Sequence, residues 1–319
     1  MLTHVTIQNY RSIWQASVPL SPFTLLIGAN GTGKSNFLRL LRDVSQIAAQ
    51  YFDPIPPTAG VSISGFEKHL NHFQDQRSFV FENDKERRVV IHDEIMRYIL
   101  QEMKSVKVYT IDPQKAGSSE KIIEKPEVRE DGSGVVQVLD ALKTGDREDL
   151  FDTIEAKLKT YIPEIEKLSF IPEADGKQLQ VRERNLDKPF PVSELSDGTR
   201  IVLTILTIIY QEHPPSIICL EEIDRGLHPR LYEQVIQLCF DLSRQEGGPQ
   251  IIATTHNPYL VDQFKDHESA VIVVEKENAE TTFTTLAEKL EHLEPGEEPL
   301  GSLWYSGFVG GVPQPAQVE

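Results

Sequence analysis

The order of apolar runs along this 319-residue chain predicts strands that alternate with helices. Residues 2–7 and 13–18 alternate between apolar and polar side chains, as half-buried strands do, and the apolar run 23–27 is typical of a buried strand. Helical spacing begins after Ser35 and predicts a helix to about Gln50. The prolines that follow cannot continue a helix.

The segment 54–190 has a different pattern and predicts a compact α+β insertion. The elements expected in it are a hairpin (77–82 and 87–91), a helix (91–103), a strand (106–111), a mobile loop (114–131), a helix (150–161) and a second hairpin (167–172 and 177–182). Because no heptad repeat is sustained, we expect no long coiled-coil arm.

The segment 191–319 returns to long apolar runs. Its expected elements are a buried helix capped by Ser196 (201–210), an apolar strand that ends in acids (216–224), a helix that starts at Pro229, a strand (250–255) and a closing hairpin (270–275 and 281–286). The whole pattern predicts an α/β fold with a mixed, largely parallel central sheet and helices on both faces. The predicted domains are 1–53, 54–190 and 191–319.

One stretch between the third strand and its helix has the composition of a phosphate-binding P-loop. It reads Gly-Ala-Asn-Gly-Thr-Gly-Lys-Ser, and its glycines allow successive backbone N–H groups to point at phosphate oxygens. The lysine reaches the β and γ phosphates of such ligands, and the serine hydroxyl binds Mg²⁺. The residues expected to bind nucleotide here are Gly28, Asn30, Gly31, Thr32, Gly33, Lys34, Ser35 and Asn36.

Two further strands are followed by side chains that could bind a metal or take part in catalysis. The buried strand before Glu221 and Glu222 ends in adjacent carboxylates, which are costly to bury without a partner, and metal binding would offset that cost. The strand 250–255 is followed by His256, Asn257 and Pro258.

Composition limits the partners that we expect. The net charge is −17, so a duplex-DNA surface would have to be local or belong to another protein. No apolar run approaches the length of a membrane span, and the first residues lack the blocks of a signal peptide, so we expect a cytoplasmic protein without membrane contact. Cys219 and Cys239 fall in apolar patterns and are expected to be reduced core residues.

Taken in order, these motifs resemble those of the ABC-type ATPase heads of the RecF, SMC and overcoming-lysogenisation-defect group. They are most similar to the stand-alone AAA-family ATP-binding proteins of bacterial anti-phage modules. The resemblance rests on the P-loop, the signature Leu-Ser-Asp-Gly-Thr at 195–199, the Walker B strand ending at Glu221 and Glu222, the segment 224–229, the switch histidine His256 and the closing stretch 303–307.

The resemblance implies a role for each matching residue. Glu221 and Ser35 would hold Mg²⁺, Glu222 would act as general base on the attacking water, and His256 would sense the γ-phosphate, with Lys34 on the phosphates. The signature residues expected at the nucleotide are Ser196, Asp197, Gly198 and Thr199. Since a carboxylate would repel the γ-phosphate, we expect Asp197 to turn toward the N–H groups of its helix.

Two positions stay open at this stage. Gln74 and Gln76 are candidates for the glutamine that couples Mg²⁺ to the insertion in such proteins. Arg11 is either a nucleotide contact or a solvated arginine.

The resemblance also implies a function. It predicts an ATPase that needs ATP and Mg²⁺ and forms a homodimer around ATP, with the signature of one copy closing over the P-loop of the other. The chain ends soon after the last hairpin, so we expect a separately encoded effector, such as a nuclease, rather than a fused one. A RecF-like DNA-repair ATPase and a transporter nucleotide-binding subunit are the alternatives.

Overall fold

The computed structural model of the chain describes residues 1–52, 61–62, 88–89, 105–118, 125–173, 176–291, 293 and 298–313. The chain divides into two compact units. Unit 1 consists of Met1–Val108, Ser216–Glu222 and Leu242–Glu319, and unit 2 consists of Tyr109–Pro215 and Ile223–Asp241. The boundaries of these units differ from the predicted domain boundaries at 53/54 and 190/191. The predicted domains therefore stay a prediction.

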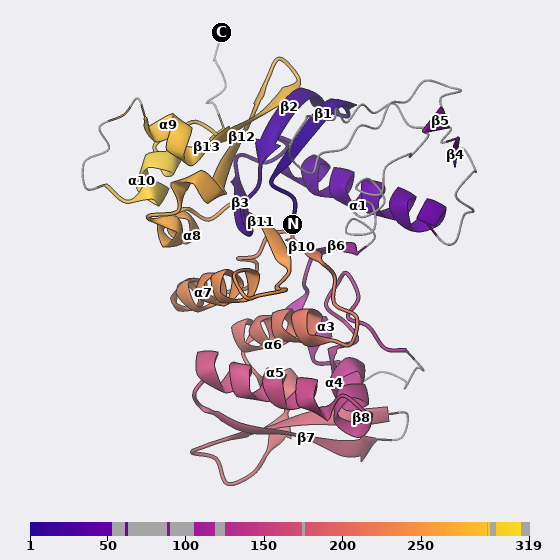
Figure 1. The fold of residues 1–319 in the computed structure, drawn as a ribbon. Helices are drawn as coiled ribbons and strands as arrows, with labels where there is room; N and C mark the ends of the chain where they lie inside the picture. The colour runs from indigo at the N-terminus through magenta and orange to yellow at the C-terminus, as the bar shows by residue number, and fades with distance from the viewer. Residues whose placement is uncertain are drawn as a thin grey trace. The chain divides into compact units, whose positions relative to one another are not determined.

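A six-stranded sheet forms the centre of unit 1 (Figure 1). Its strand order is β13 (Glu280–Thr285), β12 (Val271–Glu277), β3 (Phe23–Ile27), β11 (Gln250–Thr255), β10 (Ile217–Leu220) and β6 (Val106–Tyr109). The neighbours β12, β3, β11 and β10 run parallel, whereas β13 is antiparallel to β12. The largely parallel sheet predicted from the sequence is confirmed.

The N-terminal elements of unit 1 follow the predicted pattern. Strands β1 (His4–Tyr10) and β2 (Ile13–Pro19) form an antiparallel hairpin, and helix α1 (Lys34–Phe52) follows the P-loop. The hairpin, α1 and the sheet share one apolar core, so burial of this core fixes α1 near the sheet. Its members include Ile7, Ile13, Val18, Leu26, Phe37, Leu38, Leu41, Val44, Ile252, Ile272 and Val274.

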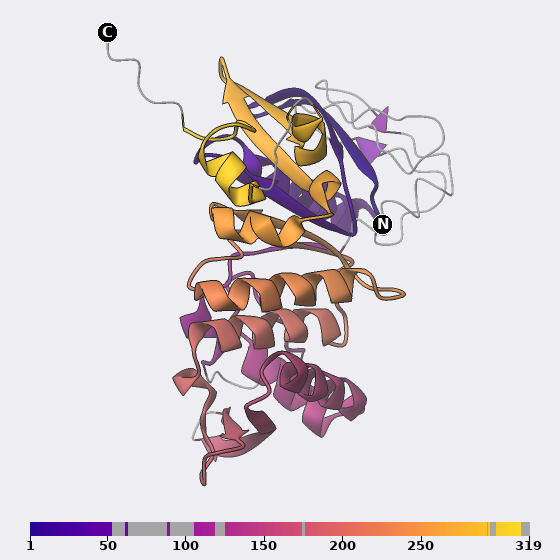
Figure 2. The same cartoon turned by 90° about the vertical axis from the view of Figure 1, so that its left-hand side faces the viewer.

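The C-terminal elements of unit 1 pack beside the sheet (Figure 2). They are α8 (Pro258–Val261), the turn Asp262–Phe264, α9 (Leu286–Leu290) and α10 (Leu300–Tyr305). Trp304 is buried, and its Nε1 donates a hydrogen bond to the carbonyl oxygen of Gly311 at 3.3 Å. A Cβ atom on Gly311 would lie 3.5 Å from Cα of Gly28, so this turn packs against the start of the P-loop.

Unit 2 stacks helices on a small antiparallel sheet. Its elements are α3 (Pro113–Ala116), α4 (Val135–Thr144), α5 (Glu148–Tyr161), β7 (Ile165–Glu173), β8 (Gly176–Glu183), β9 (Phe190–Pro191), α6 (Asp197–Tyr210) and most of α7 (Tyr232–Ser243). Figures 1 and 2 show α5 between α6 and the β7–β8 hairpin. Nearly every residue of α6 is buried, as its apolar sequence predicts.

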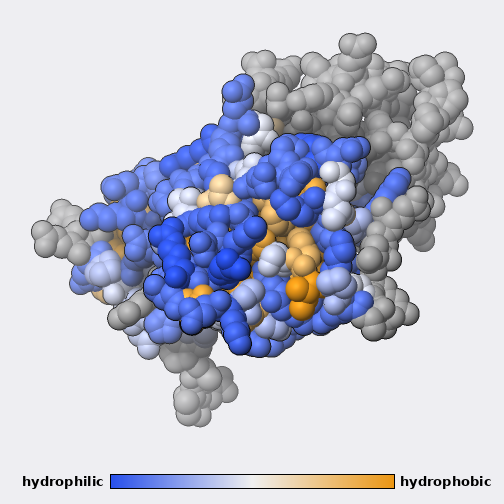
Figure 3. Space-filling model, turned by 90° about the horizontal axis from the view of Figure 1, so that it is seen from below, coloured by the Kyte–Doolittle hydropathy of each residue, from blue (hydrophilic) through white to orange (hydrophobic). Residues whose placement is uncertain are grey.

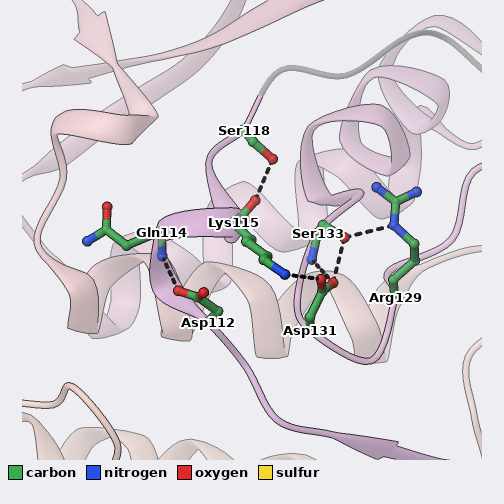
Figure 4. A network of polar contacts seen from close by, with 7 residues as sticks. All are labelled: Asp112, Gln114, Lys115, Ser118, Arg129, Asp131 and Ser133. Carbon is green, nitrogen blue, oxygen red and sulfur yellow. Dashed lines mark hydrogen bonds and ion pairs between the residues drawn. The ribbon is translucent and has the colours of Figure 1, made fainter.

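The segment predicted as a mobile loop, 114–131, begins in a helix, because residues up to Ala116 belong to α3. Residues 125–131 have no regular secondary structure, and a polar network links Lys115, Arg129, Asp131 and Ser133 (Figure 4). The mobility of the segment stays a prediction. Asp131 accepts hydrogen bonds from Lys115 Nζ at 2.8 Å and from Ser133 Oγ at 2.6 Å, and Arg129 Nε donates to Ser133 Oγ at 2.7 Å. Partial burial opposes ionisation, but these hydrogen bonds hold the pKa of Asp131 well below its usual range.

Helix α4 has no counterpart in the sequence-based prediction. Seven of its ten residues are buried, including Gln137 and Asp140, so it lacks the polar face that marks an amphipathic helix. The glycines before it, Gly132 and Gly134, have positive φ angles and give the sequence the character of a loop.

Two predicted elements lie outside the described residues, apart from residues 88–89: the hairpin at 77–82 and 87–91, and the helix at 91–103. Residues 88–89 form β5 (Arg88–Val89), which pairs with β4 (Val61–Ser62). The hairpin β7–β8 and the closing hairpin β12–β13 are confirmed. The helix expected from Pro229 starts with one 3₁₀ turn, Pro229–Leu231, before α7.

Surface properties agree with the composition. Figure 3 shows mostly hydrophilic residues on one face, with small hydrophobic areas between them. Both cysteines are buried and free, as predicted, and burial raises the pKa of Cys219 to about 12. Within the described part of the chain, no helix has the length and apolar character that crossing a membrane requires.

Candidate functional site

Three parallel strands end side by side in unit 1, and each is followed by residues of the predicted site. The register pairs Ile27 of β3 with Thr255 of β11, while β10 pairs with the other edge of β11. Gly28 follows β3, Glu221 follows β10 and His256 follows β11. Ligands of open α/β sheets bind at the carboxyl ends of such strands, so this edge is the candidate site.

The P-loop wraps around the buried side chain of Lys34. Its Nζ donates hydrogen bonds to the carbonyl oxygens of Gly28 at 2.7 Å and Ala29 at 2.9 Å. Burial lowers the pKa of Lys34 to about 8, while the nearby carboxylates of Glu222 and Glu221 act in the opposite direction. The ammonium group therefore lies inside the loop, next to the acids that end β10.

Two P-loop glycines are required by close contacts. Gly28 has φ +153°, and a Cβ atom there would lie 2.3 Å from the carbonyl oxygen of Val274. Gly33 has φ +120°, and its Cβ atom would lie 2.6 Å from the side chain of Thr281. Any other residue would push the loop off β12 or β13.

Ser35 and Glu221 meet as the sequence predicts. The Ser35 hydroxyl, at the start of α1, donates a hydrogen bond to Oε1 of Glu221. Among the residues that the structure describes, no group of three or more His, Cys, Asp and Glu side chains is placed to hold a metal ion. Mg²⁺ takes one or two protein oxygens and completes its shell with water and phosphate oxygens, so this pair fits Mg²⁺ bound together with a nucleotide.

Glu222 has an unusual backbone conformation. Its φ is +52°, in the left-handed region, and its side chain is exposed. Its N–H donates a hydrogen bond at 2.9 Å to Oγ1 of Thr254, a buried residue of β11. Such a conformation costs on the order of 1–3 kcal/mol in a non-glycine residue and persists where its surroundings hold it.

His256 lies at the same edge and is exposed, and the residues on either side of it form hydrogen bonds. The N–H of Asn257 donates to Thr255 Oγ1 at 3.0 Å, and Asn257 Oδ1 caps α8 by accepting from the N–H of Tyr259. His256 therefore stands directly between β11 and the hydrogen-bonded cap of α8.

The remaining P-loop residues differ in their surroundings. Asn30 and Gly31 are exposed at the tip of the loop, whereas Thr32 is buried and its Oγ1 donates to the carbonyl oxygen of Ala29 at 3.0 Å. The amide of Asn36 donates to Oγ of Ser12 at 2.9 Å. Asn36 thus has a protein partner beside any role at the nucleotide.

The signature residues lie in unit 2, at the start of α6. Ser196 is the N-cap, as predicted, and its Oγ accepts a hydrogen bond from the N–H of Thr199 at 3.2 Å. The predicted orientation of Asp197 is wrong. Its Oδ1 accepts from Arg200 at 2.5 Å and from Nε2 of Gln114 at 3.3 Å, because the buried guanidinium of Arg200 needs an anionic partner.

Gly198 has a packing reason to be glycine. A Cβ atom there would lie 1.9 Å from Cδ1 of Leu231 and 3.4 Å from Cδ2 of Leu227. The contact of Gly198 with nucleotide stays a prediction, and so do those of Ser196 and Thr199.

Several residues of this region carry no sequence signal that identifies them. Thr254 and Thr281 each lie beside other threonines in their strands, and Gln114 falls in the segment predicted as a loop. Gln74 and Gln76 lie outside the described residues. Arg11 is exposed with φ +53°, and its guanidinium lies 5.6 Å from the ring centre of Tyr10.

The fold and these contacts define the class of protein, a P-loop nucleotide-binding protein, and the family models that match it describe ATPase domains. Residues 1–127 match the model of the AAA ATPase domain, and residues 116–262 match the model described as AAA domain, putative AbiEii toxin, Type IV TA system. Together the two matches span residues 1–262, and each covers less than half of the chain. No curated protein matches it.

Solved structures of SMC heads share the fold. An SMC head bound to the C-terminal winged-helix domain of ScpA has a TM-score of 0.54 at 15% identity, covering 91% of this chain and 99% of the SMC chain. The SMC head of Thermotoga maritima has a TM-score of 0.51 at 13% identity, covering 89% and 98%. The predicted ABC-type, SMC-like head is confirmed at the level of the fold.

Proposed function

We propose that this chain is an ATP-hydrolysing switch that dimerises around ATP and controls a separately encoded effector in anti-phage defence. The observation that carries the ATPase part is the meeting of Ser35 with Glu221 at the P-loop, beside the strained backbone of Glu222. This arrangement provides a phosphate cradle, a metal pair and a carboxylate next to one another.

Each residue has one task in the proposed reaction. The N–H groups of the P-loop and the Lys34 ammonium bind the phosphates, and Ser35 and Glu221 would hold Mg²⁺, which would neutralise phosphate charge. Glu222 orients the attacking water and accepts its proton, and His256 donates a hydrogen bond to the γ-phosphate. Phosphoryl transfer depends mainly on such positioning.

The position of the signature supports the proposed dimer. Ser196 stands at the exposed N-terminus of the 14-residue helix α6, where backbone N–H groups favour an anion. In the proposed dimer this end meets the γ-phosphate held by the P-loop of the second copy. ATP then joins the two copies, and hydrolysis releases them.

The test is Glu222→Gln. Loss of the general base should lower phosphate release by roughly 10²–10⁴-fold, and the variant should accumulate as an ATP-bound dimer. Glu233→Gln, which changes an exposed glutamate of α7, is the control and should hydrolyse ATP at the wild-type rate. Undiminished hydrolysis by Glu222→Gln would contradict the role of Glu222 as general base. An ATP-bound variant that stays monomeric would contradict the proposed dimer.

The effector part of the proposal rests on the comparisons. The description of the second matching family names a putative toxin and a type IV toxin–antitoxin system, and a structurally similar SMC head is bound to a partner protein. When the Glu222→Gln variant is used as bait in a pull-down from the native host with ATP present, it should recover a separately encoded effector protein, such as a nuclease. Degradation of nucleic acid by the purified chain alone would contradict a separate effector.

Two other functions predict different results. A RecF-like repair ATPase would be strongly stimulated by DNA in a salt-sensitive complex, despite the net charge of −17. A transporter subunit would co-purify with a membrane protein.

A further inference from the structure

A chain of hydroxyl groups connects the P-loop to two strands that come from opposite ends of the sequence. Thr281, in β13, has a fully buried side chain whose Oγ1 lies 2.7 Å from the carbonyl oxygen of Thr32 and 2.8 Å from Oγ of Ser12. Ser12 lies in the turn between β1 and β2, and its Oγ accepts from the Asn36 amide. The backbone adds a further link, since the N–H of Thr281 donates to the Ser12 carbonyl oxygen at 2.7 Å.

The Thr281 hydroxyl is the donor in this network. Its Oγ1 donates toward two acceptors, the carbonyl oxygen of Thr32 and Oγ of Ser12, and Ser12 Oγ also accepts from the Asn36 amide. The P-loop is therefore held from both sides, at Thr32 and at Asn36.

The same threonine limits the residue next to Thr32. Gly33 approaches so closely that a Cβ atom there would lie 2.6 Å from both Oγ1 and Cγ2 of Thr281. The loop therefore rests directly on this side chain, and a change in Thr281 is transmitted to the backbone that leads into Lys34.

We propose that Thr281 and Ser12 are positioning residues of the nucleotide site, which hold the Thr32–Gly33 backbone in the conformation that binds phosphate. This inference rests on the proposed ATPase function and adds two residues to its site. They act through the P-loop and do not touch the reacting atoms. Loss of the hydrogen bonds that Thr281 and Ser12 make should weaken ATP binding more than it slows the chemical step. These bonds support the P-loop in the ground state and in the transition state alike.

The test compares three variants by binding of a fluorescent ATP analogue and by kcat and KM. Thr281→Val keeps the shape of the side chain but leaves the Thr32 carbonyl oxygen without its donor, and we expect about tenfold weaker binding, a higher KM and a kcat within threefold of wild type. Thr281→Ser keeps the hydroxyl and should restore binding. Thr282→Val changes the exposed neighbour on the same strand and should have no effect.

Unfolding is measured alongside, so that stability and binding are separated. If Thr281→Val fails to fold, Ser12→Ala serves instead, since it shortens a partly exposed turn residue and breaks the same chain of hydroxyls. Wild-type affinity in a folded Thr281→Val or Ser12→Ala variant would overturn the inference. Failure of the wild-type chain itself to bind ATP would instead overturn the proposed function.

Discussion

The backbone N–H of Glu222 donates a hydrogen bond to Oγ1 of Thr254, and this bond fixes the left-handed residue that follows Glu221. Thr254 belongs to β11, the strand between β10 and the P-loop strand β3. The position of the proposed general base is therefore set by a buried hydroxyl in the neighbouring strand, on a rigid element of the sheet.

We expect Thr254→Val to slow hydrolysis without weakening nucleotide binding. The valine leaves the Glu222 N–H without its acceptor and frees the strained residue to relax, so kcat should fall about tenfold while the affinity for ATP stays within twofold. Thr254→Ser, which keeps the hydroxyl, should recover most of the rate. Steady-state kinetics and a binding titration check this, and a parallel loss of affinity would contradict it.

The buried Lys34 ammonium should make the stability of the nucleotide-free protein depend on pH. Below pH 8 the lysine is protonated in the folded and unfolded chain, and the cost of burying the charge is fully present. Between about pH 8 and the unfolded value of 10.5 the folded chain loses the proton first, so this group's contribution to the free energy of unfolding rises with pH.

Lys34→Met removes that dependence. The free energy of unfolding of the wild type, relative to this variant, should rise by roughly 3 kcal/mol between pH 7.5 and 10.5. Urea unfolding at several pH values measures the difference, with Lys167→Met as a control at an exposed lysine. A difference that is constant over this range would show that Lys34 is not desolvated in the folded protein.

Gly198→Ala separates the two roles of the signature glycine. The new methyl group must displace Leu231, and overpacking of this kind costs about 1–2 kcal/mol of stability. In the double variant Gly198→Ala, Leu231→Ala the space is restored. We expect it to lift the overpacking penalty of Gly198→Ala, so that both stability and ATP-dependent dimerisation approach those of Leu231→Ala alone.

The double variant also has an outcome that contradicts the packing role. Thermal unfolding and size-exclusion chromatography with ATP follow stability and dimerisation separately. A stable double variant that still fails to dimerise would show that the glycine is needed at the nucleotide rather than against Leu231.

The features that the sequence predicts best are those whose causes are local. The P-loop can be recognised from the sequence because its glycine, lysine and serine residues must follow one order between a strand and a helix. The contact of Ser35 with Glu221 follows because the carboxyl ends of parallel strands share one edge of the sheet.

Long-range partners explain what sequence reasoning missed. Asp197 pairs with Arg200 because that guanidinium is buried, and the burial depends on packing around α6 that no local pattern records. Thr281 carries no signal either, since β13 contains four threonines and only the structure shows that this one lies 2.7 Å from the carbonyl oxygen of Thr32. Helix α4 was missed because burial on nearly all sides removes the periodic contrast.

The position of β3 has a consequence for synthesis of the protein. This strand leaves the ribosome early, but both of its neighbours, β11 and β12, come from the last quarter of the chain. A nascent chain therefore carries an apolar strand with two unpaired edges for most of its translation, a state prone to mispairing. Chaperone demand during translation should accordingly be high and should drop once β12 has emerged.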